Sequence, residues 1–169
     1  GSTGNGIATS LDGTTWTGRS TAVASGRDVV SNGSMFVVAN NANPTIAYSY
    51  DAITWYTTNP FTGNQAFGVA YGLDGSGAGL WIACGNTPSI ARSSNGVNWT
   101  TVTLPSGLFT SQAIGANYIN GLWYAVGFGG NTIATSTNGT TWVSKDTVMA
   151  QGWRISGPAT YAVPTVSTP

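Results

Sequence analysis

The chain has 169 residues and a mass of 17.3 kDa, with 24 glycines, seven tryptophans, one cysteine and no histidine. Five basic and five acidic side chains give a formal net charge of zero, which excludes the basic surface of a nucleic-acid-binding protein. Hydrophobic residues make up 41% of the chain, enough for a buried core, but their runs are far shorter than the ~20 residues of a membrane helix. We therefore expect a folded β-rich domain with no membrane insertion, disulfide, metal or cofactor.

The first expected element is a β-hairpin over residues 7–17, with the sequence IATSLDGTTWT, and similar segments begin at Ile46, Ile90 and Ile133. Each segment alternates larger and smaller side chains, turns, and continues in a second stretch that carries a Trp. Three of the turns contain Asp-Gly or Asn-Gly, which predicts two-residue type I′ turns. The other has Asp51-Ala52, and because Ala in a left-handed conformation costs about 1 kcal/mol, we expect that turn to differ in type or to be strained.

A second repeated pair of strands lies between these hairpins. The pairs cover residues 27–33 with 34–41, 66–72 with 79–86, and 113–121 with 121–128. Residues 150–157 and 158–165 resemble one more pair, because the sequence Tyr-Ala-Val at 161–163 matches the same sequence at 124–126. With the strands of one repeat called A, B, C and D, the chain reads C-D, three times A-B-C-D, then A-B.

Four short antiparallel strands that recur at intervals of roughly 40 residues are typical of a β-propeller blade. The sequence predicts an all-β, four-bladed β-propeller of four-stranded antiparallel blades. Its ring is closed when the N-terminal C-D strands pair with the C-terminal A-B strands, which leaves no unpaired edge. The expected single domain spans residues 1–169, with blade 1 at 5–18 plus 148–166, blade 2 at 26–58, blade 3 at 64–104 and blade 4 at 111–146.

The four turns resemble Asp-boxes, the BNR repeats of sialidase-like propellers, in a short form similar to repeats of viral, phage and bacterial surface proteins. The usual box has one further residue between the Asp and the Gly, two of the four turns have Asn for Asp, and one lacks Gly. The resemblance implies a structural role, in which the Asp or Ser side chain bonds the backbone of its own turn. The Trp that follows each turn is expected to serve packing. The structural repeat residues are Ser10, Asp12, Gly13, Trp16, Ser49, Asp51, Trp55, Ser93, Asn95, Gly96, Trp99, Ser136, Asn138, Gly139 and Trp142.

Catalytic residues are scarce, and we expect no enzyme activity. A sialidase would need three clamping Arg, a Tyr activated by Glu, and an Asp acid/base, but the chain has no Glu and its Arg residues fall at non-equivalent positions. Glycoside hydrolysis generally needs two carboxylates, and Asp28 is the one Asp expected to face the central channel. Without His, the chain cannot build a Ser-His or Cys-His nucleophile. Cys84 is expected to be a small buried apolar residue.

Any ligand is expected on the face opposite the box turns, because the loops there vary between repeats whereas the turns hardly do. Amide groups suit sugar hydroxyls and an aromatic ring suits a sugar face. The alternative interpretation is that the Asn side chains only bond turn backbones. The candidate ligand-binding residues are Asn41, Asn43, Asn86, Phe128, Asn131, Trp153 and Arg154.

Together these features favour a non-enzymatic structural or binding module, displayed extracellularly or on a virion or cell surface, with weak glycan binding. Its expected partners are glycans or another structural protein, and a monomer is favoured over a dimer whose chains share blades. Other interpretations stay open: an engineered or reconstructed propeller, suggested by the near-integral repeat count and the opening Gly1-Ser2, or a fragment of a longer repeat protein. A degenerate glycoside hydrolase is the least favoured.

Overall fold

A computed structural model describes residues 4–61, 65–86, 89–145 and 149–157. Within this part of the chain, every regular element is a β-strand, and all strand pairs are antiparallel. The strands are β1 (Ile7–Thr9), β2 (Thr17–Ser20), β3 (Gly26–Ser31), β4 (Phe36–Asn40), β5 (Ile46–Ser49), β6 (Tyr56–Thr58), β7 (Ala66–Leu73), β8 (Gly79–Gly85), β9 (Ser89–Ser93), β10 (Thr100–Val102), β11 (Leu108–Ile119), β12 (Leu122–Gly130), β13 (Ile133–Ser136) and β14 (Val143–Ser144).

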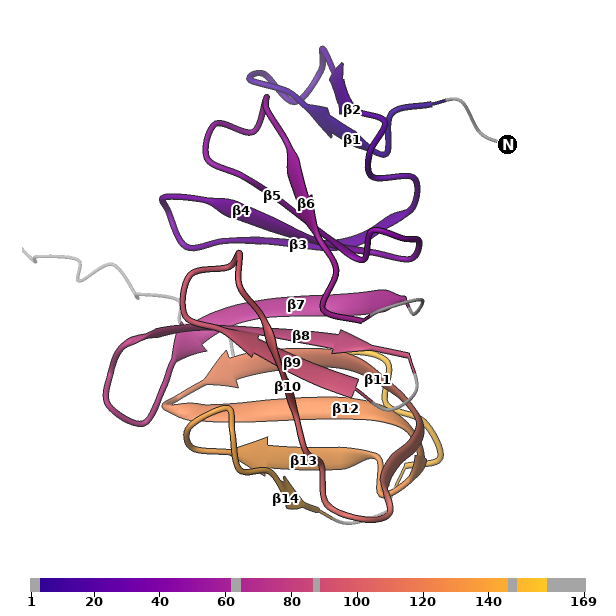
Figure 1. Cartoon of the computed structure of the whole chain (residues 1–169), viewed down its shortest axis with the longest axis vertical. Helices are drawn as coiled ribbons and strands as arrows, with labels where there is room; N and C mark the ends of the chain where they lie inside the picture. The colour runs from indigo at the N-terminus through magenta and orange to yellow at the C-terminus, as the bar shows by residue number, and fades with distance from the viewer. Residues whose placement is uncertain (1–3, 62–64, 87–88, 146–148, 158–169) are drawn as a thin grey trace, which may run out of the picture.

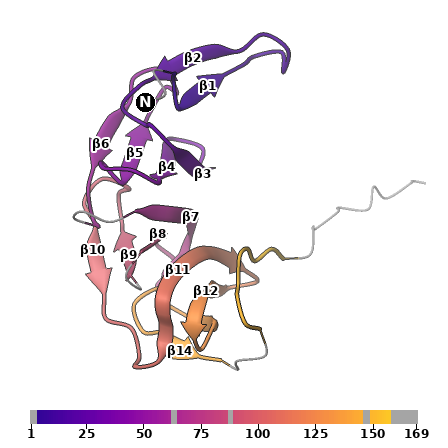
Figure 2. The same ribbon diagram turned by 90° about the vertical axis from the view of Figure 1, so that its right-hand side faces the viewer.

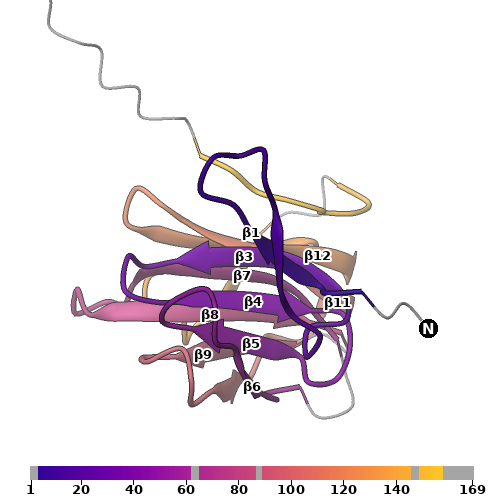
Figure 3. The same cartoon turned by 90° about the horizontal axis from the view of Figure 1, so that it is seen from above.

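The strands form one two-stranded sheet and three four-stranded sheets, in the order expected of propeller blades. We call them blade 1 (β1-β2), blade 2 (β3-β4-β5-β6), blade 3 (β7-β8-β9-β10) and blade 4 (β11-β12-β13-β14). Successive blades follow one another along the long axis of the molecule (Figure 1), and seen from above they lie one behind another (Figure 3). Figure 2 shows that they form an open arc, with β3, β7 and β11 on its concave side and β6 and β10 on its convex side. The all-β, blade-by-blade architecture is therefore confirmed.

Most of the core lies between the faces of adjacent blades. Trp81 of blade 3 belongs to a buried cluster with Met35 and Val37 of blade 2. Trp123 of blade 4 belongs to a second cluster with Leu80 and Ile82 of blade 3. Burying a large apolar side chain stabilises the folded state by about 1.5–3 kcal/mol, so stacking on a neighbour is the main source of stability for each blade.

Blade 1 has a much smaller share of this core. A third buried cluster contains Val23, Val38 and Ala47. Of the residues in β1 and β2, Ile7 packs against this cluster, and its side chain is only partly buried. Because blade 1 has two strands, its buried area on blade 2 is correspondingly small.

In all four box turns, the side-chain oxygen of the Asp or Asn accepts two backbone N–H groups of its own loop. In the first, Ser10 accepts the N–H of Gly13 at 2.8 Å, and one carboxylate oxygen of Asp12 accepts the N–H groups of Thr14 and Thr15 at 2.8 and 2.7 Å. The acceptors of the other turns are Asp51, Asn95 and Asn138. The prediction of two-residue type I′ turns is wrong, because residues 10–16 all lie between the strands and only Gly13 has a positive φ, at 72°. The side-chain acceptor holds a longer loop instead. Ala52 takes the left-handed conformation at φ 59°, as the strained-turn expectation requires.

The repeated Trp residues differ in burial, which the sequence does not predict. Trp142 is 3% exposed, Trp55 and Trp99 are partly buried, and Trp16 is 64% exposed. Trp142 is therefore packed in the core, whereas Trp16 is largely exposed in the described structure. The reason is that each hairpin packs on the preceding blade, and no described blade precedes the first hairpin.

The C-terminal A strand expected at residues 150–157 does not pair with blade 1. Gln151 instead forms a single bridge with Phe128, and residues 152–157 have no regular structure. The B strand expected at residues 158–165 lies outside the described residues. Pairing of the two chain ends is thus not seen in the described part of the chain. None of the described residues forms a helix capable of spanning a membrane.

Candidate functional site

The A strands on the concave side of the arc each contain a β-bulge at the same position. One extra residue interrupts the pairing of β3 with β4, of β7 with β8 and of β11 with β12. The extra residues are Arg27, Phe67 and Ile114. Because a bulge leaves a residue out of the ladder and redirects its side chain, the three bulges produce a row of side chains across neighbouring blades.

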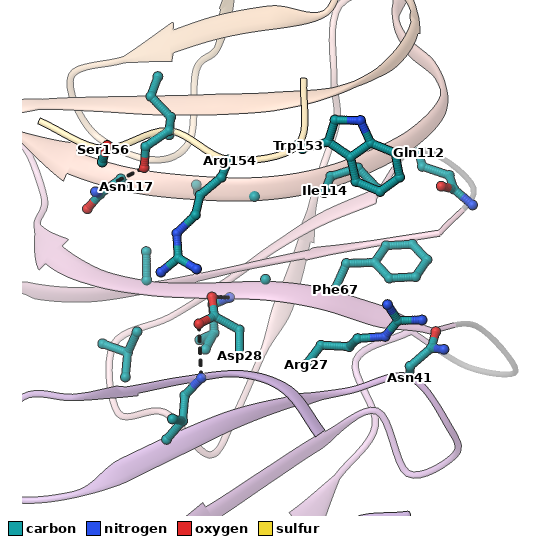
Figure 4. A pocket seen from close by; sticks show the side chains of 18 of the residues that line it. Arg27, Asp28, Asn41, Phe67, Gln112, Ile114, Asn117, Trp153, Arg154 and Ser156 are labelled. Carbon is teal, nitrogen blue, oxygen red and sulfur yellow. Dashed lines mark hydrogen bonds between the residues drawn. The ribbon is translucent and has the colours of Figure 1, made fainter. Parts of the chain in front are cut away.

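This row lines a cavity with a volume of about 670 Å³ on the concave side (Figure 4). Arg27, Phe67 and Ile114 form part of its wall, and Trp153 and Arg154 approach from the C-terminal segment. The cavity falls within the range of roughly 300–1,000 Å³ that is usual for small-ligand sites. It is an open groove along the A strands of blades 2, 3 and 4.

An aromatic pair stands at one part of the wall. The rings of Phe128 and Trp153 meet edge to face, with centroids 4.6 Å apart and an interplanar angle of 74°. Trp153 is nevertheless 66% exposed. A T-shaped contact with one ring covers at most one of the two faces of the indole, so the geometry provides a positioned stacking surface.

Two polar side chains of blade 2, Asp28 and Asn41, line the same cavity and differ in hydrogen bonding. Asp28 accepts the N–H of Val29 at 3.0 Å and, across the blade boundary, the N–H of Val69 at 3.2 Å. Its carboxylate therefore joins blades 2 and 3, and it lines the channel side as expected from the sequence. The side-chain oxygen of Asn41 is buried and accepts no hydrogen bond. A buried acceptor without a donor costs about 1–3 kcal/mol.

The structure brings four of the seven candidate ligand-binding residues together. Asn41, Phe128, Trp153 and Arg154 line the cavity, whereas Asn43, Asn86 and Asn131 do not.

The three remaining candidates have other contacts. The Asn43 side chain accepts a hydrogen bond from Asn59 at 2.8 Å, and Asn86 accepts one from Gln112 at 3.3 Å. The backbone of Asn131 is bonded to residues 107 and 109. Asn43 thus bonds a side chain of the segment that follows β6, which differs from the alternative interpretation of a bond to the turn backbone.

Sequence reasoning missed much of the cavity wall, because bulges are invisible to a simple alternating pattern. The available signal is the small residue just before each bulge, Gly26, Ala66 or Ala113, where the strand passes close to its neighbours. At Gly26, for example, an added Cβ would lie 3.3 Å from the carbonyl oxygen of Gly6. The missed lining residues with polar or aromatic side chains are Arg27, Gln65, Phe67, Tyr71, Gln112, Asn117 and Ser156.

Groups capable of catalysis are few around this cavity. Among its lining residues, Asp28 carries the one carboxylate. Burial raises the pKa of the Cys84 thiol well above its ordinary value, and the negative charge of Asp28 raises it further, so the thiol stays protonated. In the described part of the chain, no cluster of three or more His, Cys, Asp or Glu is placed to hold a metal ion.

Comparisons with known proteins add little to this geometry. No family model matches the chain, and no curated protein matches it. Among solved structures, it is similar to "a putative glycosidase from Bacteroides thetaiotaomicron VPI-5482", with 13% identity and a TM-score of 0.42. The match covers 70% of this chain and 51% of that protein, so the chain spans about half of its length. A likeness this weak supports no argument about fold or activity.

Proposed function

We propose that the protein is a non-enzymatic carbohydrate-binding module, and that its site is the cavity on the concave side of the arc. The observation that carries this proposal is Trp153, which is 66% exposed yet held edge to face by Phe128. A positioned, open indole face can stack on the apolar face of a sugar ring at little cost in conformational entropy.

Polar groups around the indole complement a polyhydroxylated ligand. The guanidinium groups of Arg27 and Arg154, which line the cavity, donate to ring or hydroxyl oxygens of the sugar.

The supply of carboxylates favours binding over hydrolysis. Glycosidases generally use two carboxylates, roughly 5 to 9.5 Å apart, one of which must exchange protons with the substrate. In this cavity Asp28 is the one carboxylate among the lining residues, and both of its oxygens already accept backbone N–H groups. Asp28 is therefore better suited to join blades 2 and 3.

A glycan array followed by calorimetry with the best ligand tests the proposal. Trp153→Ala is expected to weaken binding at least tenfold, which corresponds to about 1.4 kcal/mol. Trp16→Ala is the matched control, because Trp16 is 64% exposed but belongs to the hairpin of blade 1, away from the cavity. Binding of no glycan, or equal loss of affinity in both variants, would refute the proposal.

The Asn41 side chain provides a second matched pair. Asn41→Ala removes a polar side chain that lines the cavity and is expected to weaken binding, whereas Asn43→Ala removes a side chain that bonds Asn59 and does not line the cavity. If both changes leave the affinity unaltered, the ligand does not use the blade 2 side of the groove.

For the architecture, we propose that the turns are short Asp-box-like repeats and that a C-terminal A-B pair completes the C-D half-blade formed by β1 and β2, closing the propeller. The turn hydrogen bonds, repeated in all four hairpins, support the first part. The second part rests on the two-stranded state of blade 1 and on the sequence match at 161–163.

A further inference from the structure

Strand β1 has an unpaired edge. It pairs with β2 on one side, and no described strand pairs with its other side. In the three complete blades the equivalent strand is paired on both sides: Ile46 lies opposite Ala39, Ile90 opposite Cys84 and Ile133 opposite Val126. Ile7 occupies the equivalent position in β1 and lacks such a partner among the described residues. An exposed strand edge is a template for pairing with another strand.

An apolar groove lies beside this edge. It has a volume of about 460 Å³, and Ile7, Phe36, Val38 and Trp55 are among its lining residues. Phe36 occupies the position that Trp81 and Trp123 occupy in the next two blades. Those two Trp side chains are 1% and 0% exposed, because the A and B strands of the preceding blade cover them.

One contact shows how closely the preceding blade covers that position. The indole of Trp123 donates to the carbonyl oxygen of Leu73 at 2.7 Å, from blade 4 to the A strand of blade 3. The groove beside Phe36 therefore has the position and the lining of a site for an A-B strand pair.

At the other end of the arc, the C-terminal segment takes the place of one more A strand. Gln151 bridges Phe128 in the way that Gln112 bridges Asn86 between blades 4 and 3. The N–H of Gly152 donates to the carbonyl oxygen of Gly127 at 2.9 Å. Residues 151–155 thus sit on blade 4 as β11 sits on blade 3.

A further hydrogen bond fixes the far end of this segment. The side chain of Asn117 in β11 donates to the carbonyl oxygen of Ile155 at 3.3 Å. The segment is therefore attached at both ends to blade 4, on the concave side of the arc (Figure 2). Nothing in the described residues supplies the B, C and D strands that would complete a blade around it.

The two incomplete blades are complementary, and they lie at opposite ends of the arc (Figures 1 and 2). We propose that the C-terminal segment of one copy of this chain completes the N-terminal half-blade of a second copy. This inference rests on the blade completion proposed above and assigns the donor to another chain, in contrast to the monomer that the sequence favours. A second copy can dock without moving residues 151–155 from blade 4, whereas completion within one chain would require the ends of the arc to meet.

The proposed contact is head to tail. The half-blade of the second copy would follow the C-terminal segment of the first, so that blades continue from one copy into the next. Heterologous contacts of this kind form a closed ring when the rotation that relates one copy to the next adds up to a full turn, and a filament when it does not. With four blades from each chain, two copies would form a ring of eight.

Disulfide trapping tests the proposal directly. By the repeat register, Val163 should lie opposite Ile7, as Val126 lies opposite Ile133. Ile7→Cys and Val163→Cys are made as separate chains in a Cys84→Ala background, which matches Ala39 at the equivalent position of blade 2. The two single variants are mixed and oxidised. A covalent dimer in the mixture, absent from each variant alone, is expected.

The double variant separates the two proposals. A disulfide within a monomer, with no dimer in the mixed sample, would overturn completion by a second copy and leave blade completion standing. Absence of both disulfides would overturn both proposals.

Solution mass provides a measurement that needs no cysteines. Wild-type protein is expected to reach at least twice 17.3 kDa as its concentration rises. A chain that ends at residue 149 should stay monomeric, with blades 2 to 4 folded by circular dichroism. A wild-type mass of one chain at every concentration would contradict the proposal.

Discussion

The hairpins of blade 1 and blade 4 have nearly the same sequence and turn geometry but different surroundings. Asp12 in one and Asn138 in the other each accept two backbone N–H groups at 2.7–2.9 Å. Yet Trp16 is 64% exposed, whereas Trp142 is 3% exposed against blade 3. The motif determines the local loop, and the preceding blade determines how much apolar surface the hairpin buries. In this fold, sequence equivalence does not imply energetic equivalence.

Replacement of the two Trp residues should give the largest contrast. Trp142→Ala is expected to lower the free energy of unfolding by ~3–5 kcal/mol, because it empties a buried site. Trp16→Ala should change it by no more than about 0.5 kcal/mol. Urea denaturation followed by circular dichroism measures both. Equal effects would mean that burial on the preceding blade is not the source of the difference.

The glycines of the two turns sharpen the comparison. Gly139 and Gly13 have φ values of 66° and 72°, so Ala should cost about 1 kcal/mol at either position. A Cβ at Gly139 would also meet Leu80 and Ile82, whereas nothing lies within 4 Å of one at Gly13. Because overpacking adds about 1–3 kcal/mol, Gly139→Ala should be the more destabilising change in urea denaturation. A larger effect at Gly13 would contradict the stacking account.

Acid should distinguish the Asp turns from the Asn turns. Hydrogen bonds from the N–H groups of Thr54 and Ile53 lower the pKa of Asp51 from 3.8 to about 2. A lowered pKa in the folded state means that the carboxylate contributes stability above about pH 4, and that this contribution is lost as the pH falls towards 2. In the Asp51→Asn variant, the melting temperature should depend less on pH between pH 4 and pH 2. The reverse change, Asn95→Asp, should add pH dependence, and an unchanged slope in both would refute the assignment.

The smallest expected effect is at Ala52, the exception among the box turns. Its φ of 59° is unfavourable for Ala, so Ala52→Gly should raise the free energy of unfolding by up to about 1 kcal/mol. The control is Ala47, a buried strand residue, where Gly should destabilise the protein. A destabilised Ala52→Gly variant would show that the Cβ contributes packing that exceeds the strain.

The repeat made the blade order predictable, because alternation and turn residues are local signals. It did not reveal the length of the turn loop, since the oxygen of Asp12 replaces the backbone bond of a tight turn. Nor did it reveal the bulges that point Arg27 and Phe67 into the cavity, which arise from close approach between strands. Trp153 was predicted from its place on the last A strand, although that segment contacts blade 4 and not blade 1.

Native-state hydrogen exchange tests the central claim most directly, because it compares the two hairpins within one molecule. The N–H groups of Thr14 and Thr15 have the same acceptor geometry as those of Thr140 and Thr141. At a concentration where light scattering shows a single chain, we predict that Thr140 and Thr141 exchange more slowly, by on the order of 100-fold or more. Equal protection at the two turns would contradict the account, because the turn motif alone would then set the local stability.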